Sequence, residues 1–473
     1  MKMKGALTYG DFEQAGRIVA ADAGERRAIP DPVVVIDSRE AVAGSVFVAL
    51  PGERTDGHSY IGDVFARGAA WAVVSRAWYE AHGHEFREPE HRFVVAEDTV
   101  VALQKLASCY RERFDIPVIG VGGSNGKTTT KEMIAAVLAT NVSVHMSQGN
   151  RNNHLGVPLT LLQMRRETGI AVVEMGINHT GEMAFLCGIA RPTHGLLTNI
   201  GHEHLEFFGS LDGVADAEAE LFRFLDGNGG TAFVNMDDAR LRAAGSGLAR
   251  KVCFGTAADG DNAWWAEGIS TDRVGRVSFT LCSRVCRQQV SMNFIGRHNI
   301  INALAAATVG SHFGIASPAI ASGLEGLLPA KGWKRMELLE GGGIVVLNDT
   351  YNANPDSVRF ALDTLGGIGC AGQKIAVIGD MLELGDTSAV EHEIIGRYIQ
   401  QVPIDGVCTY GEMSRLCCRN AGARCLGHFE SMDELNAFLA DRVKAGDAVL
   451  FKGSRGMKLE LAAESLIRAK TQE

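Results

Sequence analysis

A glycine-rich loop between a strand-like and a helix-like segment constrains the fold of this chain more than any other feature. The stretch GVGGSNGKTTTKEM runs from Gly120 to Met133, after the run PVI and before a helical pattern. Glycines let backbone N–H groups turn inward around an anion, and the helix N-terminus adds partial positive charge there. The loop therefore predicts a nucleotide phosphate site in an α/β domain. Its spacing is unusual, because five residues separate Gly120 from Gly126.

The polar residues of this loop have distinct expected tasks. Lys127 is expected to reach the terminal phosphates of ATP, and the Thr128 hydroxyl is expected to bind Mg²⁺. The alternative is a structural turn that carries a lysine by chance, but the strand, the Gly-Lys-Thr sequence and the helix occur together. The remaining ATP contacts predicted here are Gly122, Gly123, Ser124, Asn125, Gly126 and Thr129.

The length and the alternation of elements predict three domains. At 473 residues, the chain corresponds to about three domains of ~150 residues each. Buried-strand patterns such as GIAVVEMG and TAFVNMD alternate with helical patterns, which favours parallel α/β sheets. A second series, including KIAVIGDM and DAVLFKGS, indicates a Rossmann-like sheet after residue 330. We predict a small α/β N-terminal domain (1–113), a central P-loop-type domain with a mostly parallel sheet (114–329) and a C-terminal Rossmann-like domain (330–473).

Composition excludes several classes of partner. The formal net charge of −10 argues against nucleic-acid binding, which needs basic surface. No run approaches the ~20 apolar residues of a membrane helix, and the N-terminus lacks the apolar core of a signal peptide. The ten cysteines are scattered, and we interpret them as reduced thiols. We therefore expect a cytoplasmic protein without membrane insertion, acting as a monomer.

Further motifs, in order along the chain, resemble the Mur ligase superfamily, which also includes folylpolyglutamate synthases. Besides the long phosphate loop, the matching segments are SQGNRNNHLGVPLT, AVVEMGINHTGEM, TNIGHEHLEFFGS, GRHNIINALAA, KGWKRMELL and NDTYNANPDS. Such ligases phosphorylate a carboxylate with ATP, and an amine then displaces the phosphate. The chemistry needs no protein nucleophile, and the chain has neither a Gly-x-Ser-x-Gly elbow nor a convincing Cys/His pair.

The resemblance implies a role for each matched position. Glu174 at a strand end and His204 would bind Mg²⁺ with Thr128, and Arg335 would enter the ATP site from the third domain. Alone, such a glutamate or histidine would be structural; the matched surroundings favour the metal role. The implied catalytic residues are Lys127, Asn152, Glu174, His204, Glu218 and Arg335. The further implied contacts are Asn299 and Asp349 for ATP, and Asn150, Asn153, Tyr351, Asn352 and Asn354 for the other substrates.

Glu218 marks a departure from the family pattern. Many members carry a carbamylated lysine fourteen residues after the metal histidine, and this chain has Glu218 there. A glutamate would supply negative oxygens without CO₂, so we expect activity without bicarbonate. The alternative is an ordinary helix carboxylate.

The N-terminal segment DSREAVAGSVFVALPGERTDGHSY resembles the uridine-nucleotide domain of the two late Mur ligases, so Ser38 and Arg39 would hold UDP. The segments YNANPDS and GDMLELG resemble the branch that adds D-Ala-D-Ala to UDP-N-acetylmuramoyl-tripeptide in peptidoglycan precursor synthesis. The expected enzyme is thus an ADP-forming amide ligase. Two alternatives remain: another ligase of the superfamily, amino-acid-adding or folylpolyglutamate-type, and a nucleotide-binding regulator that has lost catalysis.

Overall fold

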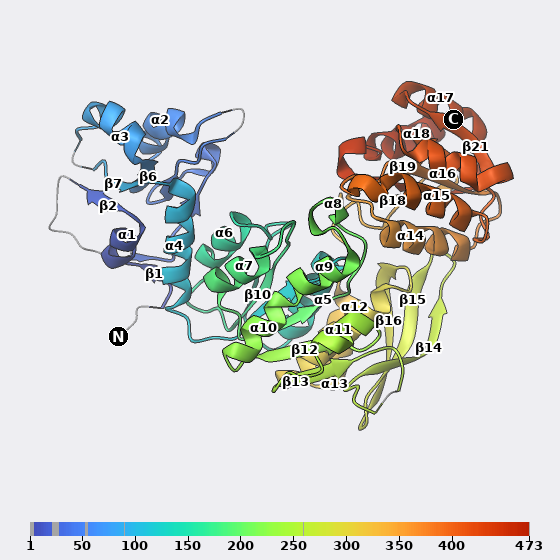
Figure 1. Cartoon of the computed structure of the whole chain (residues 1–473), viewed down its shortest axis with the longest axis horizontal. Helices are drawn as coiled ribbons and strands as arrows, with labels where there is room; N and C mark the ends of the chain where they lie inside the picture. The colour runs from blue at the N-terminus through green and yellow to red at the C-terminus, as the bar shows by residue number, and fades with distance from the viewer. Residues whose placement is uncertain (1–3, 21–27, 53–54, 89, 259, 473) are drawn as a thin grey trace.

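Three α/β units follow one another along the chain, with the central unit between the other two (Figure 1). The computed structural model describes residues 4–20, 28–52, 55–88, 90–258 and 260–472. Within this part of the chain, no helix has the length and apolar character needed to cross a bilayer. The mixed α/β fold with largely parallel sheets confirms the predicted fold class.

The N-terminal unit is built on a five-stranded sheet. Its strand order is β2 (Arg17–Val19), β7 (Phe93–Ala96), β6 (Trp71–Ser75), β5 (Val46–Val48) and β4 (Val34–Val35), and only β2 runs antiparallel to its neighbour. Helices α1 (Tyr9–Ala15), α2 (Ile61–Ala66), α3 (Arg76–His82) and α4 (Thr99–Arg111) accompany it, and β1 (Ala6–Leu7) pairs with β3 (Ile29–Pro30). Asp98 caps the N-terminus of helix α4, because its carboxylate accepts hydrogen bonds from the N–H groups of Val100 and Val101.

The central unit has a six-stranded, fully parallel sheet. Its order is β13 (Lys251–Phe254), β12 (Thr231–Asn235), β11 (His194–Leu197), β8 (Val118–Gly122), β10 (Ile170–Glu174) and β9 (Val144–Met146). Strand β8 is central, because the chain continues to β9 and β10 on one side and to β11–β13 on the other. In open parallel sheets, ligands bind at the carboxyl ends of the strands where the order reverses. The glycine-rich loop follows β8 and therefore lies at this point.

Helices cover both faces of this sheet. Helices α5 (Lys127–Ala139), α12 (Asn299–His312) and α13 (Ser317–Gly326) share one apolar cluster, and α6 (Gly156–Leu162), α7 (Glu182–Ala190) and α10 (Glu220–Gly227) share another. The short helices α8 (Leu205–Phe208), α9 (Leu211–Glu218) and α11 (Ala239–Ala244) complete the unit. A three-stranded antiparallel sheet, β14 (Trp265–Thr271), β15 (Arg276–Cys282) and β16 (Arg287–Ile295), was not among the predicted elements.

The C-terminal unit contains the second six-stranded sheet. Its order is β17 (Glu337–Gly341), β18 (Ile344–Asp349), β22 (Ala448–Lys452), β19 (Lys374–Gly379), β20 (Gly406–Tyr410) and β21 (Cys425–Phe429), with only β17 antiparallel. Its helices are α14 (Pro355–Gly367), α15 (Ser388–Ile399), α16 (Ser414–Ala421), α17 (Met432–Arg442) and α18 (Glu460–Gln472). Cys418 and Cys425 form a disulfide, so the prediction of reduced thiols was wrong for this pair. Their spacing in the sequence did not indicate the pairing.

Candidate active site

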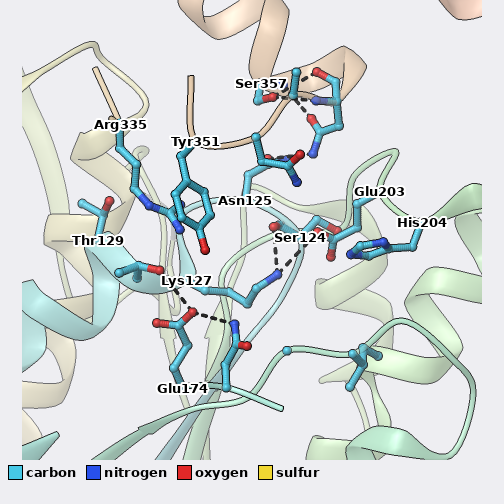
Figure 2. Close-up of a pocket in the computed structure, with 18 of the residues that line it drawn as sticks. Ser124, Asn125, Lys127, Thr129, Glu174, Glu203, His204, Arg335, Tyr351 and Ser357 are labelled. Carbon is cyan, nitrogen blue, oxygen red and sulfur yellow. Dashed lines mark hydrogen bonds and ion pairs between the residues drawn. The ribbon is translucent and has the colours of Figure 1, made fainter. Parts of the chain in front are cut away.

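A pocket of about 680 Å³ lies at the carboxyl ends of the central sheet, where the C-terminal unit meets it (Figure 2). The glycine-rich loop lines it. Two glycines of this loop are at positive φ, Gly123 at +101° and Gly126 at +84°. A Cβ at Gly123 would lie 2.5 Å from the backbone nitrogen of Thr198, so this turn requires glycine.

Lys127 is folded back on its own loop. Its Nζ donates to the carbonyl oxygens of Gly123 at 2.5 Å and Ser124 at 3.0 Å, and lies 3.4 Å from Glu203 Oε2. Burial acts to lower the pKa of Lys127, but the negative fields of Glu203, Glu218 and Glu174 outweigh it and raise the pKa. The lysine therefore stays charged and ready to exchange these oxygens for phosphate oxygens.

Glu174 ends strand β10 beneath the loop and is almost fully buried. Its Oε1 accepts hydrogen bonds from the Thr128 hydroxyl at 3.1 Å and from Asn152 Nδ2 at 2.9 Å. Its Oε2 accepts no hydrogen bond and lies 3.5 Å from Lys131 Nζ. Mg²⁺ prefers oxygen ligands and is commonly held by one or two carboxylates together with substrate phosphates. The free carboxylate oxygen and the hydroxyl beside it fit such an ion.

His204 reaches toward the C-terminal unit. It precedes α8 at φ +50°, and its Nδ1 lies 2.7 Å from Oε2 of Glu383, which itself has φ +65°. The adjacent His204 ring lowers the pKa of the Glu383 carboxyl, which stays ionised. Among the described residues, no three His, Cys, Asp or Glu side chains converge on one point. Any cation here would therefore depend on phosphate oxygens for part of its coordination.

Glu203 is a buried carboxylate that the sequence analysis missed. It lines the pocket between His204 and the loop, and only 8% of its surface is exposed. Burial raises its pKa, while Lys127 and His204 oppose the shift. The sequence could have indicated Glu203 through its position between two histidines in GHEH, next to His204.

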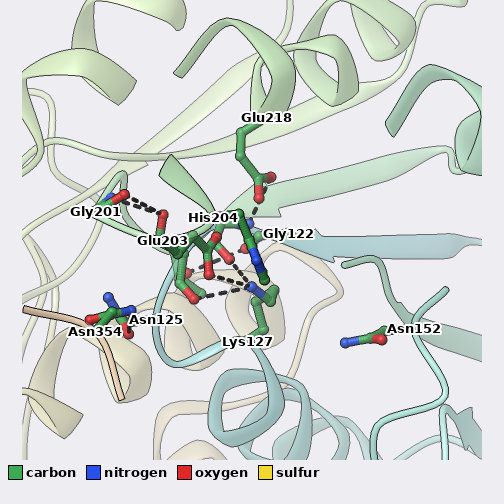
Figure 3. A network of polar contacts seen from close by, with 12 residues as sticks. Gly122, Asn125, Lys127, Asn152, Gly201, Glu203, His204, Glu218 and Asn354 are labelled. Atoms are coloured by element: carbon green, nitrogen blue, oxygen red, sulfur yellow. Dashed lines mark hydrogen bonds and ion pairs between the residues drawn. The ribbon is translucent and has the colours of Figure 1, made fainter. Parts of the chain in front are cut away.

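Glu218 lies outside the pocket lining, on the other side of the loop backbone (Figure 3). It ends helix α9, is fully buried, and accepts the Gly123 N–H at 2.8 Å with its Oε2. Its Oε1 has no hydrogen-bond partner. Burial raises its pKa to about 8, although Lys127 and the Gly123 N–H oppose the shift. This geometry argues against the expectation that Glu218 offers its oxygens to the nucleotide site, because the loop backbone already takes one of them.

The C-terminal unit contributes aromatic and charged groups to the same pocket. The guanidinium of Arg335 lies 3.9 Å from the centre of the Tyr351 ring, and both side chains face the loop in Figure 2. Asp349 pairs with Lys452 at 2.8 Å. The attraction between the guanidinium and the ring holds Arg335 in a defined position in the pocket.

Polar contacts of Asn125, His202 and His204 join the loop region directly to the C-terminal unit. Asn354 Nδ2 donates to Asn125 Oδ1 at 2.9 Å, and the His202 backbone N–H donates to Asp356 Oδ2 at 2.8 Å. His204 Nδ1 lies 2.7 Å from Glu383 Oε2. Asn354 also caps α14, where its side chain accepts the Ser357 N–H. The phosphate loop and the third unit are thus held in register.

Most of the predicted residues meet in this pocket, and a few do not. Those that line it are Ser124, Asn125, Gly126, Lys127, Thr128, Thr129, Asn152, Asn153, Glu174, His204, Asn299, Arg335, Asp349, Tyr351, Asn352 and Asn354. Gly122, Gly123, Asn150 and Glu218 lie nearby but outside the lining. Ser38 and Arg39 belong to the N-terminal unit, where Arg39 is largely exposed and pairs with Asp37.

Three other residues of the site had no assigned role in the sequence. Lys131 follows Lys127 by one helical turn, and this spacing could have found it. Asp356 and Glu383 lie in matched segments, but nothing in the sequence indicates their contacts, because each acts on a residue more than 150 positions away.

Three family models match this chain, one in each of its three units. Family models match as the Mur ligase family, catalytic domain over residues 33–111, the Mur ligase middle domain over 121–310, and the Mur ligase, glutamate ligase domain over 334–455. The UDP-N-acetylmuramoyl-tripeptide--D-alanyl-D-alanine ligase of Bacillus subtilis (strain 168) is 36% identical over 92% of this chain and 93% of its own. The chain belongs to the Mur ligase family.

Two solved structures agree within this family. A crystal structure of MurF from Acinetobacter baumannii is 31% identical, with a TM-score of 0.85 over 98% of this chain and 99% of its own. The MurF ligase of Thermotoga maritima in complex with ADP is 28% identical, with a TM-score of 0.81 over 93% of this chain and 98% of its own. The relative from Escherichia coli (strain K12) has the same name as the Bacillus protein and is 34% identical over 92% of this chain and 93% of its own.

Proposed function

We propose that this chain is the ATP-dependent, ADP-forming ligase that joins D-Ala-D-Ala to UDP-N-acetylmuramoyl-tripeptide in peptidoglycan precursor synthesis. The observation that carries the proposal is the pocket in which Lys127 and Glu174 of the central unit meet Arg335 of the C-terminal unit. A phosphate loop alone fits many nucleotide-binding proteins. A loop completed by a cation from another domain fits a reaction in which a phosphoryl group is transferred between two bound substrates.

We assign the steps of the reaction to residues of this pocket. Lys127 would leave its loop carbonyls and neutralise the phosphoryl group as it moves from ATP to the tripeptide carboxylate, releasing ADP. Arg335 would balance charge on the resulting acyl phosphate. The amine of D-Ala-D-Ala then attacks the acyl carbon, phosphate leaves and the amine loses a proton. Bound Mg²⁺ would screen the phosphates from the carboxylate, with Thr128 and Glu174 as its holders.

The other substrates would be held by parts of the chain that flank this pocket. We assign the UDP group to residues 1–113, including Ser38 and Arg39, ATP to residues 114–329, and ligase closure to residues 330–473. Asn150, Asn152 and Asn153 would contact the reacting peptide, and Tyr351, Asn352 and Asn354 would contact it from the C-terminal unit. The protein would act as a cytoplasmic monomer, since its substrates are soluble nucleotides and dipeptides.

One assay tests this proposal. Purified protein is mixed with ATP, Mg²⁺, UDP-N-acetylmuramoyl-tripeptide and D-Ala-D-Ala, and phosphate release is measured alongside the product mass. Release is expected only when all components are present, with a product heavier than the tripeptide by D-Ala-D-Ala less water. Release with single amino acids in place of the dipeptide would indicate an amino-acid-adding ligase. Release with a tetrahydrofolate and glutamate would indicate a folylpolyglutamate-type enzyme, and tight ATP binding without release would indicate a regulator.

A further inference from the structure

Two buried carboxylates in this pocket each rest against a lysine. Glu174 lies 3.5 Å from Lys131, and Glu203 lies 3.4 Å from Lys127. Lys131 is fully buried and also donates to the Gly149 carbonyl, so it is fixed in place. Lys127 is different, because its present partners are all oxygens that a phosphate can replace. Nucleotide binding would therefore separate Lys127 from Glu203 but leave Lys131 with Glu174.

Without Lys127, Glu203 would face a triphosphate as a buried anion. Its exposed fraction of 8% leaves little contact with solvent, and a buried charge without a partner is strongly disfavoured. The carboxylate must then take up a proton or gain a new cation, and the phosphates in front of it cannot supply a cation. A divalent ion placed between the carboxylate and the phosphates satisfies both.

His204 supplies a second ligand atom at the same place. In both close-up views its ring lies beside the Glu203 carboxylate (Figures 2 and 3). Its Nδ1 lies 2.7 Å from Glu383 Oε2, whereas its Nε2 forms no hydrogen bond with the described residues. A carboxylate on one ring nitrogen orients a histidine and leaves the other nitrogen for a metal.

Glu218 does not offer the same opportunity. It has no exposed surface, it bonds to the Gly123 N–H, and it lies outside the pocket lining. Accordingly, we propose that Glu203, together with His204, binds a second divalent cation once nucleotide phosphates draw Lys127 away. This assignment rests on the proposed function for the presence of ATP, and it transfers to Glu203 the task that sequence matching gave to Glu218.

Counting bound Mn²⁺ tests the proposal without peptide substrates. The full chain is loaded with a non-hydrolysable ATP analogue, and bound Mn²⁺ is measured by electron paramagnetic resonance over a range of concentrations. The wild type is expected to bind two ions. Glu203→Gln is expected to weaken the second ion by about 10- to 100-fold. Glu218→Gln, the matched control, is expected to bind both ions as the wild type does.

Other outcomes would overturn the assignment. A single ion in the wild type would do so, as would wild-type affinity for both ions in Glu203→Gln, or loss of the second ion only in Glu218→Gln. Thermal melting and the affinity for the ATP analogue establish that the variants are folded. If Glu203→Gln does not fold, Glu203→Asp is measured instead and is expected to bind the second ion with intermediate affinity; wild-type affinity there, with the shorter side chain, would count against the proposal. Failure to form the pentapeptide product would remove the proposed function and leave the ion count unchanged.

Discussion

Replacing Glu218 with glutamine should change how the stability of the central unit depends on pH. Burial raises the pKa of this carboxyl from 4.5 to about 8, so the folded protein keeps it protonated at neutral pH while the unfolded chain ionises it. A raised carboxyl pKa means that the folded state binds the extra proton between these two values. The stabilising contribution is thus complete below about 4.5 and is lost as pH rises through about 8.

The size of the effect follows from the same two values. Each tenfold difference in proton affinity corresponds to about 1.4 kcal/mol, so this single group can remove on the order of 5 kcal/mol across the window. Glutamine does not titrate, and its side-chain oxygen can still accept the Gly123 N–H. The variant should resemble the wild type near pH 5 and become the more stable of the two by up to that amount near pH 9.

Urea unfolding of the variant and the wild type at several pH values between about 5 and 9 measures the difference in their free energies of unfolding. The central-unit transition should be followed separately, since a chain of three units need not unfold in one step. Glu206→Gln, an exposed glutamate two residues after His204, serves as the control and should show no such trend. A Glu218→Gln difference that stays constant with pH would refute the reasoning, and so would a variant that is equally destabilised throughout.

Further expectations concern activity. Lys127→Ala should lower kcat by at least about 10²-fold, because the charge that moves to the phosphoryl group is gone, and thermal melting would establish that the variant is folded; near-normal phosphate release would remove the phosphate-loop assignment. Arg39→Ala should raise the KM for the UDP-peptide and leave that for ATP unchanged, since Arg39 lies in the N-terminal unit, outside the ATP pocket; equal effects on both would contradict a separate uridine site. Arg335→Lys keeps the charge but loses the planar contact with Tyr351, so kcat should fall by about tenfold; full activity would show that the stacked position has no role.

The sequence predicted the parts of this structure that depend on local patterns. The run before the glycine loop became β8, and the Gly-Lys-Thr sequence opened α5. The motif residues came together because strand ends of parallel sheets share one edge. Glu218 shows where such reasoning stops. Spacing placed it at the position of a known functional side chain, but the direction in which it points depends on how α9 packs against the loop, and no periodicity encodes that.

Contacts between residues of different units could not be predicted from the sequence either. Asp356 follows a proline at the start of α14, which predicts a helix N-terminus and nothing about a histidine in another unit. Glu383 was visible only as part of a matched segment. The antiparallel strands β14–β16 were not among the predicted elements, although β15 and β16 alternate buried and more exposed positions as strands do.

The polar contacts of Asn125, His202 and His204 with the C-terminal unit connect that unit to the phosphate-loop region. Each contact starts at, or beside, a residue that nucleotide binding must disturb: Asn125 lies in the loop, and His202 and His204 flank Glu203. Coupling between two binding sites is reciprocal, so a ligand that binds at these contacts and changes the affinity for nucleotide must have its own affinity changed by nucleotide by the same factor. A small molecule that binds between Asp356 and His202 would therefore change the affinity for ATP without occupying any substrate position.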